Sequence, residues 1–263
     1  MTQVELADIS VSYQEQGSGP PVVLLHGLAE DHRSWDGVVS HLDGFTTYAV
    51  DLRGHGGTTV GDGDGTLAQL GNDLLMFLRQ VSGPATVVGY SLGGTIGLWA
   101  ASRPEPPLVR LLAIASSSVV GRGTAEFFAG RIAQIEANQW HAFGAGLQGD
   151  TSQQVVTEVD LGALTAARLA AIGDGAGYVN AARAMIGVRS APLTPALANV
   201  TVDVDVLGGD SDTFCPRKAA DMIVDALPSA RYHEIAGAGH LISVDQPELY
   251  GELIARLLTE ALT

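Results

Sequence analysis

A serine set between glycines is the part of this sequence best suited to chemistry. Ser91 lies in Gly-Tyr-Ser-Leu-Gly, residues 89–93, after the β-branched run Val87-Val88 and before a stretch compatible with a helix. Glycines on both sides permit a sharp turn from strand to helix, which leaves the serine hydroxyl clear of the sheet. The pattern favours a nucleophilic serine. The same pattern also arises by chance in glycine-rich chains, so the assignment depends on whether suitable acid and base residues occur further along the chain.

A serine hydroxyl is a poor nucleophile at neutral pH, so Ser91 requires a base within hydrogen-bond reach. The expected base is His240, which follows Gly-Ala-Gly, residues 237–239, in a loop beyond a predicted strand at 232–235. Glycines next to the histidine leave its imidazole free to reach the serine. The imidazole would take the serine proton during attack and return it to the leaving group.

Two carboxylates compete to orient the imidazole of His240. Asp210 and Asp212 both lie in the loop after a predicted buried strand at 202–207. Asp212 is preferred because it lies three residues past Gly209, further from the strand end. Asp210, nearer the strand, is expected to cap or solvate the loop. The predicted catalytic set is therefore a serine, a histidine and an aspartate.

Two backbone N–H groups are expected to stabilise the negative charge on an attacked carbonyl oxygen. The N–H of Leu92 stands at the start of the helix after the serine. The N–H of Leu28 follows His26-Gly27, at the end of a continuous apolar run at 22–25, while His26 itself is expected to be structural. Losing one such donor typically costs about 3 kcal/mol in the transition state.

The elements that would position these groups alternate between strands and helices. Short stretches rich in strand-forming residues predict strands at 22–25, 46–50, 85–88, 108–115, 202–207 and 232–235, with amphipathic stretches between them. This order predicts a mainly parallel sheet with right-handed crossovers. Residues 4–13 alternate apolar and polar side chains, which predicts an antiparallel hairpin at the sheet edge. Ligands bind beyond the carboxyl ends of such strands, where Leu28 and Ser91 fall.

Residues 120–195 differ from the rest of the chain. Alanine-rich helical patterns alternate there with glycine breaks, and no buried strand is predicted. This segment is interpreted as a helical cap inserted into a core made of residues 1–119 and 196–263. Aromatic side chains are the candidates for a substrate pocket, although each taken singly is expected to pack within the protein core. They are Phe127, Phe128, Trp140 and Tyr178 in the cap, and Phe214 in the core.

Composition narrows the class of partner. A formal net charge of −15 argues against nucleic acid or an anionic membrane surface, because both would repel the chain. A single cysteine, Cys215, excludes an internal disulfide, and the first residues lack the basic and apolar regions of a signal peptide. These features favour a cytoplasmic location. The seven histidines show no His-x-x-x-His spacing, so neither a metal nor another cofactor is expected.

The order of serine, aspartate and histidine along the chain resembles that of the α/β-hydrolase superfamily. Five ordered motifs carry the resemblance: His26-Gly27, Asp51-Leu52-Arg53-Gly54-His55-Gly56, residues 89–94, residues 209–212 and residues 237–240. The resemblance implies an eight-stranded, mostly parallel sheet flanked by helices, with the helical cap inserted into it. A serine at position 91 argues against the dehalogenase and epoxide-hydrolase branches, which use an aspartate nucleophile.

Within the superfamily, residues 177–185 and 130–132 resemble the cap of 3-oxoadipate enol-lactonases. Arg131, Arg183 and Arg189 are candidates for a substrate carboxylate, although solvation at the surface is the expected role of each. In the motif after the strand at 46–50, an ion pair between Asp51 and Arg53 is expected to order the loop.

These features predict a cofactor-independent serine hydrolase that cleaves a small-molecule carboxylic ester or lactone through an acyl-enzyme. Two alternatives stay open. The same residues serve C–C bond hydrolases of aromatic ring-cleavage products, which differ in cap and pocket. A ligand-binding receptor could also keep these residues and use movement of the cap as its output, because a fold does not fix a function.

Overall fold

A computed structural model describes residues 1–227 and 229–260. Its sheet has eight strands in the order β1-β2-β4-β3-β5-β6-β7-β8. The strands are β1 (Thr2–Leu6), β2 (Ile9–Gly17), β3 (Pro21–Leu25), β4 (Thr46–Val50), β5 (Ala85–Tyr90), β6 (Leu108–Ile114), β7 (Asp203–Gly209) and β8 (Arg231–Ile235). β1 pairs with β2 and β2 with β4 in antiparallel fashion, and the remaining pairs are parallel. The expected eight-stranded, mostly parallel sheet is confirmed.

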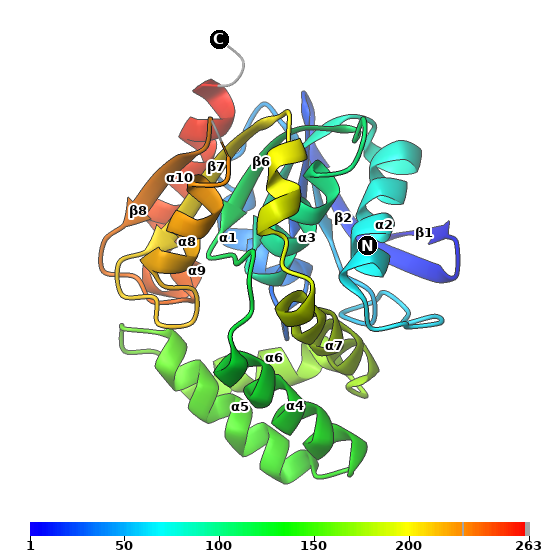
Figure 1. Cartoon of the computed structure of the whole chain (residues 1–263), viewed down its shortest axis with the longest axis vertical. Coiled ribbons are helices and arrows are strands. Elements are labelled where there is room, and N and C mark those ends of the chain that lie inside the picture. Colours follow the sequence, from blue (N-terminus) through cyan, green and yellow to red (C-terminus); the bar gives the residue numbers. More distant parts are fainter. Residues whose placement is uncertain (228, 261–263) are drawn as a thin grey trace.

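Helices cover both faces of this sheet (Figure 1). On one face lie α2 (Leu67–Phe77), α3 (Leu92–Ala101) and α8 (Arg217–Val224), and on the other lie α1 (Asp36–Val39) and α10 (Pro247–Glu260). The short α9 (Ile242–Asp245) precedes α10, and the 3₁₀ turn η3 (Thr194–Asn199) leads into β7. This layered arrangement buries the parallel strands on both sides, as their continuous apolar runs require.

Two helices differ from their predicted extents. The helix expected to open at residues 34–36 is divided into a 3₁₀ turn, η1 (His32–Trp35), and a single α-helical turn, α1. Gly37 and two valines in this turn are weak helix formers, which accounts for the short helix. The helix predicted to run to residue 81 changes after α2 into a π-helical turn, η2 (Leu78–Ser82), which Gly83 ends with a φ of 71°.

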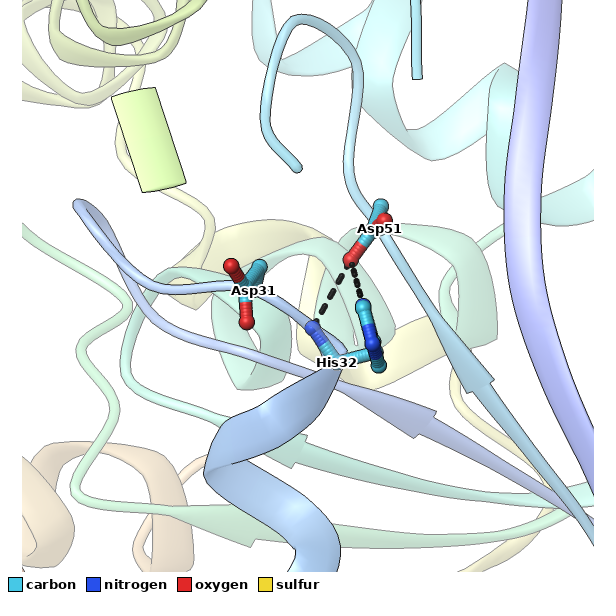
Figure 2. A group of neighbouring side chains, drawn as sticks. All are labelled: Asp31, His32 and Asp51. Carbon is cyan, nitrogen blue, oxygen red and sulfur yellow. Dashed lines mark hydrogen bonds and ion pairs between the residues drawn. The ribbon is translucent and has the colours of Figure 1, made fainter. Parts of the chain in front are cut away.

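The loops after β3 and β4 are joined by a polar network that differs from the expected one. Asp51 does not pair with Arg53: its Oδ1 accepts hydrogen bonds from the N–H and Nδ1 of His32, both at 2.8 Å (Figure 2). Arg53 instead forms ion pairs with Asp8 and Asp73. The prediction of an Asp51–Arg53 pair was wrong because the partners of Arg53 lie far away in sequence and are brought near it by folding.

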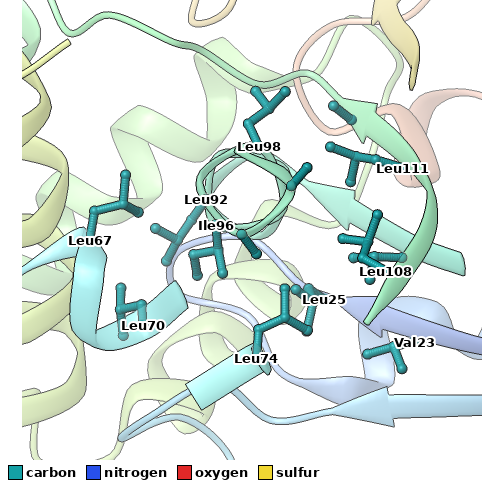
Figure 3. Packing of buried hydrophobic residues seen from close by; sticks show 14 of the residues in the cluster. Val23, Leu25, Leu67, Leu70, Leu74, Leu92, Ile96, Leu98, Leu108 and Leu111 are labelled. Atoms are coloured by element: carbon teal, nitrogen blue, oxygen red, sulfur yellow. The ribbon is translucent and has the colours of Figure 1, made fainter. Parts of the chain in front are cut away.

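The main hydrophobic core lies between α2, α3 and the strands. Figure 3 shows Leu92, Ile96 and Leu98 of α3 surrounded by side chains of α2 and of the strands. The sequence of α3 is apolar on all sides because the helix is buried almost completely. A deeply buried α3 gives the residue before it, Ser91, a rigid support.

Four helices between β6 and η3 make a separate layer (Figure 1). They are α4 (Arg122–Glu136), α5 (Trp140–Gln154), α6 (Leu161–Ile172) and α7 (Ala176–Ser190), and the structure describes no strand among residues 120–195. A small cluster that includes Phe143, Ile172 and Tyr178 packs between them. These helices face the end of the sheet at which β5 leads into Ser91.

Candidate active site

Ser91 stands on a strained turn between β5 and α3. Its φ of 50° and ψ of −110° place it in a region that L-residues rarely adopt. Neighbouring glycines make the turn possible. A Cβ atom on Gly93 would lie 2.2 Å from the carbonyl oxygen of Leu25, and one on Gly89 would lie 2.5 Å from the backbone of Gly93. The structure therefore contains the strand–serine–helix turn that the sequence motif predicted.

The structure brings Ser91, His240 and Asp212 into one hydrogen-bonded chain. Ser91 Oγ lies 3.1 Å from His240 Nε2, and His240 Nδ1 lies 2.8 Å from Asp212 Oδ2. Only 6% of His240 and 5% of Asp212 are exposed. The imidazole thus bridges the hydroxyl and the carboxylate, with a geometry suited to moving a proton from the serine.

Asp212 is kept as an anion by its surroundings. Burial raises the pKa of this carboxyl, but the charge and hydrogen bond of His240 outweigh burial, together with the N–H groups of Phe214 and Cys215, so the pKa lies below its usual value. Those two N–H groups donate to Asp212 Oδ1 at 2.8 and 2.9 Å. Asp210, the competing candidate, accepts hydrogen bonds from Gly237 N–H and the Ser211 hydroxyl and has no contact with the imidazole in the structure.

Two aromatic rings hold the imidazole of His240. Phe214 stacks on it with ring centroids 5.5 Å apart, and Tyr90 lies at 5.4 Å in a tilted arrangement. The Tyr90 hydroxyl also donates a hydrogen bond to the carbonyl oxygen of His240 at 3.0 Å. Sequence reasoning did not identify Tyr90. Its place next to the serine was the available signal, but the partner lies 150 residues away.

The backbone N–H groups of Leu28 and Leu92 are available for an oxyanion. Leu92 is the first residue of α3, so its N–H has no acceptor within the helix. In the loop after β3, Gly27 N–H donates to the carboxylate of Glu30, whereas Leu28 N–H has no hydrogen-bond partner among the described residues. His26 holds this loop to the next one: its Nδ1 donates to the Gly27 carbonyl, and its Nε2 accepts from the N–H of Leu52.

A cavity of about 400 Å³ opens beside Ser91 and His240. Four of the five expected aromatic residues line it: Phe127, Phe128, Tyr178 and Phe214. Trp140 does not line this cavity, contrary to expectation. Its ring packs edge-on against Phe143 at 5.9 Å, within the cluster between the cap helices. Trp140 lies at the first turn of α5, and helical spacing alone does not show which side of a helix faces a site.

Two of the three arginines proposed as carboxylate ligands are already engaged, and the third, Arg189, is exposed in the last turn of α7 and does not line the cavity. Arg131 forms an ion pair with Asp150 at 2.8 Å, and Arg183 pairs with Glu136. A different arginine, Arg168 of α6, lines the cavity, and sequence reasoning did not single it out. Its signal was weak, because an arginine in an alanine-rich helix usually faces solvent.

The donor set of Asp31, His32 and Asp51 could in principle hold a cation, since their ligand atoms lie within 4.8 Å of one another (Figure 2). These atoms already have partners. Both oxygens of Asp31 accept hydrogen bonds from the guanidinium of Arg33, and Asp51 Oδ2 accepts one from the N–H of Gly57. The cluster is therefore explained as a network that orders the loops after β3 and β4.

The family model of the alpha/beta hydrolase fold matches residues 20–247. The chain belongs to the α/β-hydrolase fold family. No helix within residues 1–227 and 229–260 is both long and apolar enough to cross a membrane.

Named relatives cover nearly the whole chain at low identity. A 3-oxoadipate enol-lactonase 2 from Acinetobacter baylyi is 23% identical, over 95% of this chain and 94% of the relative. A pimeloyl-[acyl-carrier protein] methyl ester esterase from Nitrosomonas europaea is 27% identical, over 92% and 96%. Among solved structures, an enol-lactonase from Burkholderia xenovorans LB400 superimposes with a TM-score of 0.87 at 21% identity, over 98% of this chain and 100% of the other. That likeness shows the fold.

Proposed function

We propose that this protein is a serine hydrolase that cleaves a carboxylic ester or a lactone, including an enol-lactone, of a small molecule. The observation that carries the proposal is the continuous hydrogen-bonded chain from Ser91 through His240 to Asp212, which opens onto a cavity. The names of the relatives support the same reaction class, since both an enol-lactonase and a methyl ester esterase cleave an ester bond.

The reaction would proceed in two halves. Ser91 Oγ attacks the carbonyl carbon while His240 Nε2 takes its proton, and the carbonyl oxygen becomes an anion held by the N–H groups of Leu28 and Leu92. Collapse of this intermediate breaks the C–O bond, and the imidazolium protonates the departing alkoxide. Water, activated by His240 in the same way, then hydrolyses the acyl-enzyme and frees the acid and Ser91. With a lactone, the alcohol and the acid are parts of one product.

Helices α4–α7 act as a cap over this chemistry in the proposal. Phe127, Phe128 and Tyr178 from the cap line the cavity with largely apolar surface. Such a lining limits water around the reacting carbonyl, and it suits an acyl group of modest size. The division of the chain into core residues 1–119 and 196–263 and cap residues 120–195 is part of the same proposal.

Hydrolysis of short p-nitrophenyl esters by Ser91→Ala tests the assignment. Turnover should fall by at least a thousandfold with little change in unfolding temperature, because the serine carries the acyl group. Ser190→Ala, an exposed serine on α7, is the matched control. A fluorophosphonate should add its mass to the wild-type chain at Ser91 and not to Ser91→Ala.

Three outcomes would contradict the proposal. Ester hydrolysis by Ser91→Ala at the native rate would show that Ser91 is not the nucleophile. Labelling of Ser91 without turnover of any ester or lactone would favour a receptor. Turnover of coloured dienoate ring-cleavage products in place of esters would favour C–C bond hydrolysis by the same residues.

A further inference from the structure

Arg168 is a buried cation without a carboxylate partner among the described residues. It lies on α6 beside the cavity, with 7% of its surface exposed. The described residues include two other buried arginines, Arg53 and Arg110, and both form ion pairs with aspartates. Burying a charge is costly unless it is paired. The unpaired charge of Arg168 therefore points to a role at the site.

Three hydrogen bonds fix the guanidinium between the cap and the core. Nη1 donates to Thr151 Oγ1 at 2.9 Å and to Gln154 Oε1 at 2.5 Å, both on α5. Nη2 donates to the carbonyl oxygen of Leu28 at 3.3 Å, and Nε has no partner. One side chain thus joins two cap helices to the loop that carries the Leu28 N–H.

That loop contains a strained residue directly after Leu28. Ala29 has a φ of 59° and is buried. This left-handed conformation is unfavourable for alanine by roughly fivefold or more in population. Rotating the Leu28–Ala29 peptide by half a turn would bring φ of Ala29 to the negative side and relieve the strain. The rotation would also turn the Leu28 carbonyl away from Arg168.

A second cavity borders the same loop. Ala29 and Arg168 line this cavity of about 330 Å³, formed with Leu164, Val244 and Tyr250. One side of this loop therefore borders a cavity and not packed side chains. The hydrogen bond from Arg168 is the polar contact that the structure gives the Leu28 carbonyl.

We propose that Arg168 is a positioning residue. Its hydrogen bond to the Leu28 carbonyl fixes Leu28 between the cap and the core, and so holds the N–H of the same residue, which belongs to the preceding Gly27–Leu28 peptide, directed at the oxyanion. The cap then contributes to catalysis from outside the core, and the positive charge beside the cavity favours the developing anion. This inference rests on the proposed ester or lactone hydrolysis. The carbonyl of Gln154 accepts the N–H of Leu241 at 2.9 Å, so the same helix end also contacts the loop of His240.

Arg168→Met tests the inference by its effect on kcat against KM. We expect kcat to fall about 10- to 100-fold, less than the roughly 100- to 1,000-fold typical of deleting an oxyanion donor, with KM changed less than about threefold. Affinity for a trifluoromethyl ketone, which forms a tetrahedral adduct with the serine, should fall in parallel with kcat/KM. Arg183→Met, an exposed cap arginine away from the cavity, is the matched control.

Rescue by a second substitution separates positioning from general packing. Ala29→Gly removes the penalty for the left-handed conformation, so it should raise kcat of Arg168→Met about fivefold. This gain in kcat should be larger than the effect of Ala29→Gly on kcat in the wild-type background. Such a difference would show that the two positions are energetically coupled. If Arg168 made only a structural contact, the effects of Arg168→Met and Ala29→Gly on kcat would be additive in this double-mutant cycle.

Each alternative result overturns the inference. Native kcat and native ketone affinity in Arg168→Met would do so, as would additivity with Ala29→Gly. Parallel loss of affinity for the acid product would show that Arg168 binds the ligand directly. If Arg168→Met does not fold, Thr151→Val and Gln154→Met remove the side chains that orient the guanidinium and should each lower kcat about two- to tenfold. An unchanged kcat in both of these variants would equally end the inference.

The two proposals fail differently. If ester turnover does not depend on Ser91, the proposed function is wrong. If turnover depends on Ser91 and Arg168→Met retains it in full, only the role of Arg168 is wrong.

Discussion

The hydroxyl of Tyr90 donates a hydrogen bond to the main-chain carbonyl of His240 at 3.0 Å, which ties the residue before the proposed nucleophile to the backbone of the proposed base. Only 8% of Tyr90 is exposed, so its hydroxyl has little access to water. The bond therefore fixes the position of the loop that carries His240 relative to Ser91.

Tyr90→Phe should loosen this connection. The carbonyl of His240 would lose the phenol but keep the N–H of Ile242 as a donor, so the loss costs about 0.5–1.5 kcal/mol in the free energy of unfolding. The ring contact with the imidazole would remain, so we expect kcat to fall only several-fold with KM nearly unchanged. Urea unfolding and steady-state kinetics measure the two effects. Tyr13→Phe is the matched control, because Tyr13 is buried among aromatic rings without a hydroxyl hydrogen bond in the structure.

Asp212→Asn should nearly abolish turnover while its neighbour tolerates the same change. An amide in place of the carboxylate can favour the wrong tautomer of His240 and no longer stabilises the imidazolium, which lowers kcat by about 1,000- to 10,000-fold. Asp210→Asn affects only loop hydrogen bonds from Ser211, Gly237 and Ala238, so its kcat should stay within about tenfold. Comparing kcat for the two variants checks the choice between the aspartates, and equal losses would show that it is incorrect.

Local motifs predicted the positions of the sheet and of the three candidate catalytic residues. Short stretches of strand-forming residues mark the parallel strands. Each candidate residue lies in the segment after one of them: Ser91 directly after β5, Asp212 in the loop after β7 and His240 in the loop after β8. Because the carboxyl ends of parallel strands meet at one edge of the sheet, their order in sequence was enough to expect Ser91, Asp212 and His240 together. Their catalytic roles stay a proposal.

Contacts between distant elements were beyond that reasoning. The partners of Arg53, the inward direction of Arg168 and the packing of Trp140 among the cap helices all depend on how elements distant in sequence sit against one another. Helical periodicity gives the faces of a helix but not the neighbour that each face meets. The strain at Ala29 was equally hidden, since alanine carries no sequence signal for a positive φ.

Protonation of buried histidine should make the protein less stable in mild acid. Burial lowers the pKa of His55 to about 3, with the charge of His26 acting in the same direction, and Nε2 of His55 has no hydrogen-bond partner among the described residues. Below the ordinary pKa of about 6.5 the unfolded chain binds a proton that the folded chain refuses until about pH 3. Stability from this group is therefore full above pH 6.5 and declines as the pH falls toward 3.

The expected slope is close to 1.4 kcal/mol per pH unit for one such histidine. His55→Asn can still donate to the carbonyl of Arg53 and should make the loss of unfolding free energy between pH 6 and pH 5 smaller by roughly 1 kcal/mol. Urea unfolding at several pH values measures this, in a range above the titration of most carboxylates. His141→Asn, an exposed residue on α5, serves as the control. Identical slopes for wild type and His55→Asn would refute the prediction.

Two glycine substitutions should have opposite effects on stability. A methyl group on Gly93 would lie 2.2 Å from the Leu25 carbonyl, and neither the strand nor α3 can move away, so Gly93→Ala should cost about 3 kcal/mol or more. Gly130 is exposed on α4, with no atom within 4 Å of an added methyl. Gly130→Ala should therefore stabilise the fold by about 0.5–1 kcal/mol. The free energy of unfolding in urea measures both, and a stable Gly93→Ala with an intact site would mean that the turn at Ser91 is less tightly packed than the structure indicates.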